Sequence, residues 1–108
     1  MLTPGKYYVN TSIRLTMAFE DADGNDVDPT TVTFKTYDPL GVTTTYVYET
    51  DDELLRASEG HYTADIVPDS PGRWHFLWLT TGTGTTIAIE GDFLVQDSVF
   101  YDGDVGYA

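Results

Sequence analysis

The segment from residue 21 to residue 28 is the first place where side chains could do chemistry. It reads Asp21-Ala22-Asp23-Gly24-Asn25-Asp26-Val27-Asp28, with oxygen ligands at alternate positions as at the start of a calcium loop. That loop needs glycine at its sixth position and a bidentate glutamate at its twelfth, where this chain has Asp26 and Val32. We therefore interpret the segment as an acidic turn between strands. Asp21, Asp23 and Asn25 remain weak candidates for metal ligands, and we expect no specific calcium requirement.

The other candidates for catalysis lack the partners that catalysis needs. His61 and His75 belong to no zinc-protease motif and stand near no nucleophile-elbow serine. The glycine-rich stretch 82–86 contains no lysine, so a hairpin turn is a better interpretation than a phosphate-binding loop. The carboxylates cluster in turns, where water keeps them ionised. The sequence thus predicts no catalytic residue, no cofactor and no enzymatic activity.

Aromatic side chains offer a second kind of chemistry, stacking and contact. Trp74 and Trp78 share a strand face with Phe76, which could be a sugar-stacking platform, but in a β-sandwich that face is usually the core. Tyrosine is enriched at interfaces because its ring is apolar and its hydroxyl is polar. We therefore predict a contact surface from the aromatic residues of the fourth strand and of the C-terminal tail: Tyr46, Tyr48, Phe100, Tyr101 and Tyr107.

The elements that must position these side chains are strands. Apolar and polar residues alternate with the period of two that marks a half-buried strand, for example through Ile13, Leu15 and Met17. Turn residues such as Asp38-Pro39-Leu40-Gly41 separate such stretches about every ten residues. The one helix signal, residues 51–56, is too short for more than a single turn or a loop. The alternation predicts a core of Ile13, Leu15, Met17, Phe34, Tyr62, Ile66, Trp74, Phe76, Trp78, Ile89 and Phe93.

One domain accounts for most of the chain. The 108 residues show no internal repeat and no linker, and their length suits one domain with its own core. We expect a sandwich over residues 1–96 and an acidic, aromatic extension over residues 97–108 that could serve as a docking arm. No apolar stretch is long enough for a signal peptide or a membrane span, so a secreted protein is disfavoured.

The charge limits the possible partners. Eighteen acidic residues against five basic ones give a net charge of −13, which repels nucleic acid and anionic membranes, and we expect neither as a partner. Acidic excess with only two lysines is a pattern of proteins from high-salt cytoplasm, where screening removes self-repulsion. An ordinary acidic surface kept soluble by its charge is the alternative.

Several stretches together resemble a known group of proteins. They are Phe19–Asn25 followed by Asp28-Pro29-Thr30-Thr31-Val32-Thr33-Phe34, then Tyr37–Gly41, then Gly60-His61-Tyr62 with Pro71-Gly72-Arg73-Trp74. The pattern, from about Gly5 to Val95, resembles small immunoglobulin-like proteins encoded among the capsid and connector genes of tailed bacterial and archaeal viruses. The resemblance implies an all-β, immunoglobulin-like antiparallel β-sandwich of about seven strands.

For function, the resemblance implies a virion structural protein without enzymatic activity. A head–tail connector or head-closure subunit is the first interpretation, in a homo-oligomeric ring or other symmetric assembly with other virion proteins. A capsid decoration or fibre-associated domain is an alternative. A cell-surface adhesion or carbohydrate-binding module is an alternative from a different class, since sandwich folds serve many functions.

Overall fold

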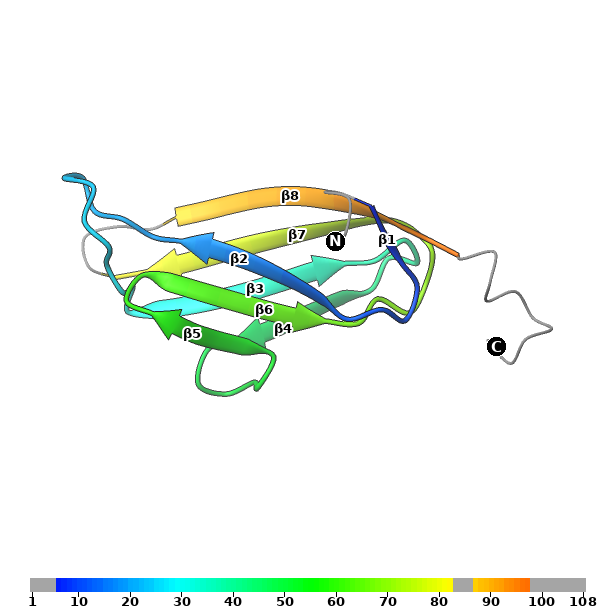
Figure 1. The fold of residues 1–108 in the computed structure, drawn as a ribbon, viewed down its shortest axis with the longest axis horizontal. Coiled ribbons are helices and arrows are strands. Elements are labelled where there is room, and N and C mark those ends of the chain that lie inside the picture. Colours follow the sequence, from blue (N-terminus) through cyan, green and yellow to red (C-terminus); the bar gives the residue numbers. More distant parts are fainter. Residues whose placement is uncertain (1–5, 83–86, 98–108) are drawn as a thin grey trace.

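The computed structural model describes residues 6–82 and 87–97, which form strands joined by turns (Figure 1). That part of the chain contains no helix able to cross a membrane. The strands are β1 (Lys6–Tyr8), β2 (Ile13–Ala18), β3 (Thr31–Tyr37), β4 (Thr43–Val47), β5 (Leu54–Ser58), β6 (His61–Ile66), β7 (Gly72–Thr81) and β8 (Ile87–Gln96).

The strands form two packed sheets. The larger sheet has the order β1-β8-β7-β3-β4, and the smaller sheet has the order β2-β6-β5. Every pair is antiparallel except β1 with β8, which is parallel and covers only Leu94, Val95 and Gln96 of β8. The outer strand of the larger sheet on one side is therefore β4, and much of β8 has no described neighbour on the other.

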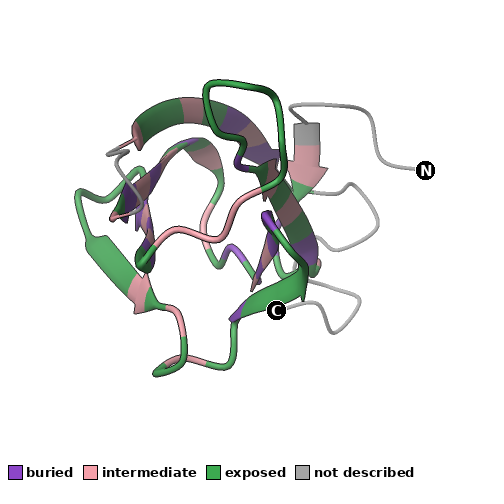
Figure 2. Ribbon diagram, turned by 90° about the vertical axis from the view of Figure 1, so that its left-hand side faces the viewer, coloured by how far each residue is buried: buried purple, intermediate pink, exposed green. Residues whose placement is uncertain are grey.

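The core lies between the sheets, as the alternating burial along the strands shows (Figure 2). Trp78 is at its centre and is 1% exposed, with its ring 4.7 Å from that of Phe34 on the neighbouring strand. Seven of the predicted core residues are buried, and Leu15, Met17 and Phe76 are half-buried against them. The buried hydrophobic residues that the predicted core omits are Val9, Phe19, Val32, Leu54, Ala64 and Val95.

The larger sheet extends beyond the smaller one on the side of β8. Ring contacts between the sheets set the alignment: Tyr48 lies 5.2 Å from Tyr62, and Phe19, just after β2, lies 6.4 Å from Trp78 of β7. Phe93 and Val95 of β8 are nevertheless buried in the core, so the smaller sheet leaves only part of β8 uncovered. Ile89 lies in that part and its side chain is 39% exposed, so the prediction that it belongs to the core is wrong.

Residues 51–53 form a turn and residues 54–56 belong to a strand, so the interpretation of the segment as a helical turn or a loop is wrong for its second half. Leu54 begins β5 and is the only buried residue of that strand, which leaves no alternation to read from the sequence. The backbone N–H of Leu54 donates to the carbonyl of Asp51 at 3.2 Å and closes the preceding turn. This additional strand makes eight in the described residues where about seven were expected.

The tryptophan strand β7 is covered on one face only. Trp74 and Trp78 point into the core, as expected, while His75 is exposed and Leu77 and Leu79 are half-buried on the opposite face. The sequence suggests two covered faces because leucines alternate with the tryptophans. No second layer lies on the leucine side in the described part of the chain, so this side forms the outer face of the larger sheet.

Asp28 joins the loop before β3 to the β5–β6 hairpin. Its carboxylate accepts hydrogen bonds from Arg56, from the backbone N–H of Gly60 at 2.8 Å and from the Tyr62 hydroxyl at 3.1 Å. The bonds from Arg56, then that from Gly60, lower the pKa of Asp28 to about 2. Burial and the bond to Asp28 raise the pKa of Tyr62 to about 12, so the hydroxyl keeps its proton and stays a donor.

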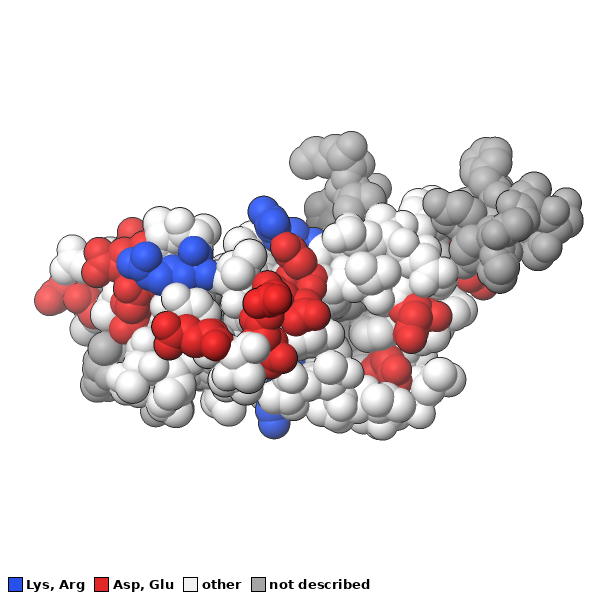
Figure 3. All heavy atoms as spheres, turned by 90° about the horizontal axis from the view of Figure 1, so that it is seen from below, with Lys and Arg blue, Asp and Glu red and all other residues white. Residues whose placement is uncertain are grey.

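Among the charged side chains visible in Figure 3, acidic ones outnumber basic ones. Each of the three arginines already pairs with an aspartate: Arg14 with Asp65 at 2.7 Å, and the other two as Arg56–Asp28 and Arg73–Asp92. Exposed pairs of this kind contribute little stability, so they offset only a small part of the repulsion in a chain with a charge of −13.

We expect the melting temperature to rise from low salt to molar KCl. In molar salt the screening length falls to about 3 Å, which removes most of the repulsion between the acidic side chains. High salt also strengthens apolar burial, so a matched variant is needed. Asp52→Asn combined with Glu53→Gln removes two exposed charges, and its melting temperature should rise less with KCl than that of the unaltered chain. If the melting temperatures of both proteins rise equally, the rise is due to apolar burial. A melting temperature of the unaltered chain that stays constant or falls with KCl would contradict the prediction.

Candidate docking surface

The free edge of β4 presents backbone groups that no other described strand uses. Two bonds fix which residues face β3: the N–H of Tyr48 donates to Val32, and Val42 accepts from the N–H of Asp38, each at 3.0 Å. Because the pattern alternates along an antiparallel pair, Thr43, Thr45 and Val47 direct their N–H and C=O groups away from β3. An edge of this kind can add a strand from another chain.

One end of this edge is closed by the chain itself. The N–H of Val47 donates to Asp51 Oδ2 at 2.8 Å, and the Val47 carbonyl accepts from the N–H groups of Thr50 and Asp51. The sequence of β4 carries no charge, but the turn that follows the strand blocks pairing at this end. The open edge is therefore short and consists of Thr43 and Thr45.

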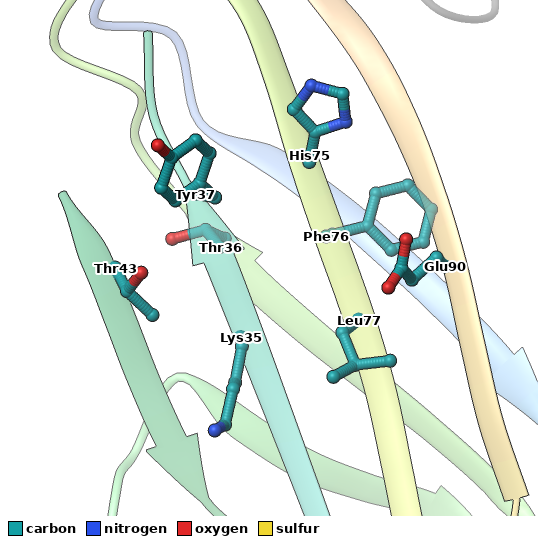
Figure 4. A pocket seen from close by; sticks show the side chains of 8 residues that line it. All are labelled: Lys35, Thr36, Tyr37, Thr43, His75, Phe76, Leu77 and Glu90. Carbon is teal, nitrogen blue, oxygen red and sulfur yellow. The ribbon is translucent and has the colours of Figure 1, made fainter. Parts of the chain in front are cut away.

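The outer face of the larger sheet adjoins this edge and carries a shallow hollow of about 310 Å³ (Figure 4). Lys35, Tyr37 and Thr43 line one side, and His75, Leu77 and Glu90 line the other. The Tyr37 side chain is 51% exposed, and its ring centroid lies 6.4 Å from that of His75. Opposite charges, an exposed aromatic ring and an apolar base in one hollow suit contact with another molecule.

The free edge of β8 is protected by charge. The N–H of Val9 donates to the carbonyl of Gln96, so the even-numbered residues of β8 direct their backbone groups away from β7. Beyond the short β1 these include Glu90 and Asp92, whose acidic side chains are exposed. Charged side chains on an edge strand oppose pairing with another strand. The edge of β4, with threonines at its open positions, lacks this protection.

The predicted interface tyrosines of the fourth strand face inward. Tyr46 lies opposite Phe34 in the register, with ring centroids 6.1 Å apart, and Tyr48 packs edge-on against Tyr62. Both are half-buried against the core, so they do not form the exposed patch that the sequence suggests. The other predicted interface residues, Phe100, Tyr101 and Tyr107, lie outside the described residues, as does most of the docking arm 97–108.

The alternation of the sequence indicates which residues form the outer face, but the predicted interface residues are different ones. The alternation that places Phe34 in the core also places Lys35 and Tyr37 on the opposite face. The alternation around Trp78 does the same for Leu77 and His75. The aromatic content of the fourth strand drew attention to Tyr46 and Tyr48, whose facing depends on the register with β3.

The acidic turn uses its first carboxylate internally. Asp21 Oδ1 accepts from the N–H groups of Asp23 and Asn25 at 2.9 and 3.0 Å, and these bonds lower the pKa of Asp21. Gly24, at φ 85°, provides the left-handed residue of the turn. Within residues 6–82 and 87–97, no three acidic or histidine side chains are grouped so that they could hold a metal ion.

We expect thermal melts with calcium and with chelator to coincide. A turn without the closing glutamate should bind calcium weakly and without preference over magnesium. Asp21→Asn serves as the matched variant and should respond to neither addition. A calcium-dependent rise in melting temperature that magnesium does not reproduce and that Asp21→Asn loses would contradict the prediction.

Neither histidine forms a catalytic arrangement with other described residues. His61 Nε2 lies 3.3 Å from Asp26 Oδ2, and both side chains are 47% exposed. His75 lies on the outer face beside Tyr37, in the hollow. Both histidines are exposed at the surface, and their lack of a catalytic role remains a prediction.

No family model matches this chain, and no curated protein does. Solved structures do. The Lin-41 filamin domain matches with a TM-score of 0.64 and 14% identity, over 87% of this chain and 85% of that one. The fold is immunoglobulin-like. A proposed glycoside hydrolase of Bacteroides vulgatus ATCC 8482 matches with a TM-score of 0.59 and 16% identity, over 86% of this chain but only 16% of that chain.

These likenesses concern the fold alone, because identities of 14% and 16% are too low to carry a function. The predicted fold class, an all-β immunoglobulin-like sandwich, is confirmed. The chain spans about one sixth of the length of the Bacteroides protein, so that protein's activity says nothing direct about this domain.

Proposed function

We propose that this immunoglobulin-like domain is a non-enzymatic structural subunit that docks onto other proteins through β4 and the outer face. One observation supports this most strongly: an uncharged, open strand edge borders a face that no other layer of the described residues covers. Pairing at the edge would supply main-chain hydrogen bonds, and the face would supply Tyr37 and Leu77 for contact. Both lie on rigid strands, so a partner would meet a preformed surface.

The assembly that we propose is the particle of a tailed virus, with the domain as a head–tail connector or head-closure subunit. This part rests on the sequence resemblance. A head-to-tail contact repeated around a closed axis would generate a ring, and each subunit would be held by two neighbours at once. A capsid decoration or fibre-associated domain would use the same surface with a different symmetry. In either case the chain is located in the virion.

Incorporation into particles tests the proposal. Thr45→Pro removes an N–H that points away from β3, so the variant should fold but should not accept a strand. Thr16→Pro is the matched control. The N–H of Phe19 donates to the carbonyl of Gly60, and backbone groups alternate in direction along β2, so the Thr16 N–H points away from β6 to the free edge of β2. We expect Thr16→Pro to be incorporated and Thr45→Pro to be excluded.

Deletion of residues 97–108 is a second arm of the same experiment. The last strand ends at Gln96, so the shortened chain should keep its melting temperature, while its incorporation should fail if the extension is a docking arm. The proposal would be contradicted if each variant, Thr45→Pro and the shortened chain, were incorporated normally into particles. It would also be contradicted if the unaltered chain were absent from particles.

The outer-face hollow favours a second candidate function, a carbohydrate-binding or adhesion module. Tyr37 could stack on a sugar ring while Lys35 and Glu90 bond to its hydroxyls. Titration with a panel of soluble oligosaccharides distinguishes the two. Saturable binding that Tyr37→Ala abolishes would favour the carbohydrate module, and no binding at millimolar concentration would leave the structural role.

A further inference from the structure

A second hollow lies between the two sheets, directly inside the free edge of β4. Its volume is about 200 Å³, and Thr44 and Tyr46 of β4 form part of its wall. Its lining contains two carboxylates, those of Asp38 and Asp69, and no basic side chain. This hollow is separate from the one on the outer face, although both adjoin β4.

The walls combine negative charge with exposed apolar surface. Val42 and Val67 line the hollow and are 53% and 58% exposed, and Trp74 contributes a largely buried ring. Asp38 is fixed in place because its Oδ1 accepts from the N–H groups of Leu40 and Val42 at 3.0 and 2.8 Å. A side chain that suits these walls has an apolar stem and a positive head, as lysine and arginine do.

A strand added to β4 would bring such a side chain to this place. Side chains alternate between the two faces of a strand, and those on the inner face of the added strand would lie beside Thr44 or Tyr46. Both of these residues line the hollow. The free backbone groups of Thr43 and Thr45 would hold the added segment, while the hollow would select one of its side chains.

We propose that β4 accepts an extended segment of a different protein, and that one lysine or arginine of this segment enters the hollow between Asp38 and Asp69. This inference rests on the proposed docking role and names its partner chemistry. Among the basic side chains that the structure describes, a second copy of this chain offers a poor source, because each of its three arginines is paired with an aspartate. Lys35 of a second copy is half-buried on the outer face.

Designed peptides test the proposal directly. We would use seven-residue peptides of alternating threonine and valine that differ only in their central residue: lysine, norleucine or glutamate. Binding to the full chain is measured by calorimetry and by the fluorescence of the tryptophans, one of which lines the hollow. We expect the lysine peptide to bind about tenfold more tightly than norleucine, the glutamate peptide to be the weakest, and the lysine preference to decrease with salt.

Two variants separate the hollow from the edge. Asp69→Asn changes an exposed side chain and should remove the lysine preference while the norleucine peptide still binds. Thr45→Pro should weaken all three peptides, and Thr16→Pro should change none. If no peptide binds at millimolar concentration, or if lysine shows no advantage over norleucine, the inference is overturned.

The outcome is distinguishable from failure of the proposed function. Peptides that bind at β4 without a charge preference, together with exclusion of Thr45→Pro from particles, would leave the docking role and remove the basic partner. A lysine preference that depends on Asp69, together with normal incorporation of Thr45→Pro, would support the hollow as a site for a basic side chain and contradict the virion role.

Discussion

Replacing Trp78 by alanine is expected to lower the free energy of unfolding by about 3–5 kcal/mol. The side chain is 1% exposed and contacts rings from both sheets, with centroids 4.7 Å away at Phe34 and 6.4 Å away at Phe19. Its removal leaves a cavity that rings fixed on different strands cannot easily close. Because small domains have only about 5–15 kcal/mol in total, the variant should be marginally folded. Urea unfolding followed by circular dichroism measures the change.

Ile89→Ala is the matched control for this prediction. Ile89 lies opposite Trp78 in the register of β7 and β8, so it shares the inner face, but it is 39% exposed where the larger sheet extends beyond the smaller one. Replacing Ile89 by alanine should lower the free energy of unfolding by about 1 kcal/mol or less, well below the loss expected for Trp78→Ala. Equal losses for the two variants would show that the core is not centred between the sheets as described.

Replacing Asp28 by asparagine is expected to destabilise the domain in a pH-dependent way. The folded-state pKa of Asp28 is about 2, below its ordinary value of 3.8, because the folded chain bonds to the ionised form. The stability that this provides is fully present above about pH 4 and is lost as the pH falls through about 2. Asparagine cannot accept the same charge-assisted bonds from Arg56 and Gly60.

Urea midpoints of the two proteins between pH 7 and pH 2 test this prediction. The midpoint of Asp28→Asn should be lower than that of the unaltered chain at pH 7, and the gap should narrow as the pH approaches 2. Asp23→Asn, in the exposed acidic turn, controls for the loss of a charge and should show no such gap. A gap that is constant down to pH 2 would mean that the ionised carboxylate is not what stabilises the Asp28 junction.

Alternation along a strand was enough to predict most of the fold. The periods around Phe34, Tyr62 and Trp78 placed these residues in the core, and the turn at Asp38–Gly41 joined the strands that it was expected to join. The errors came from facts that alternation cannot contain. Ile89 has the right period for burial, but its exposure depends on how far one sheet extends past the other. Leu54 is a single buried residue, which gives no period at all.

The candidate site was harder to predict because it depends on register and on backbone direction. Whether Tyr46 faces in or out is decided by its pairing with Phe34, which composition does not reveal. The availability of the Thr45 N–H follows from the bonds that its neighbours make to β3. Asp38 and Asp69 are thirty-one positions apart in the sequence, and only the folded chain brings them to one hollow.

Protection of β4 in assembled particles is the most direct test of the docking account. The chain contains no cysteine, so Thr45→Cys introduces a single reactive thiol at an exposed position on the free edge. Its rate of maleimide labelling is compared between the free protein and purified particles, with Thr16→Cys on the β2 edge as the reference. The account predicts that Thr45→Cys reacts rapidly in the free protein and slowly in the particle, while the reference changes much less. Equal labelling of Thr45→Cys in both states would contradict the account, because an edge that pairs with a partner strand cannot remain equally open to the reagent.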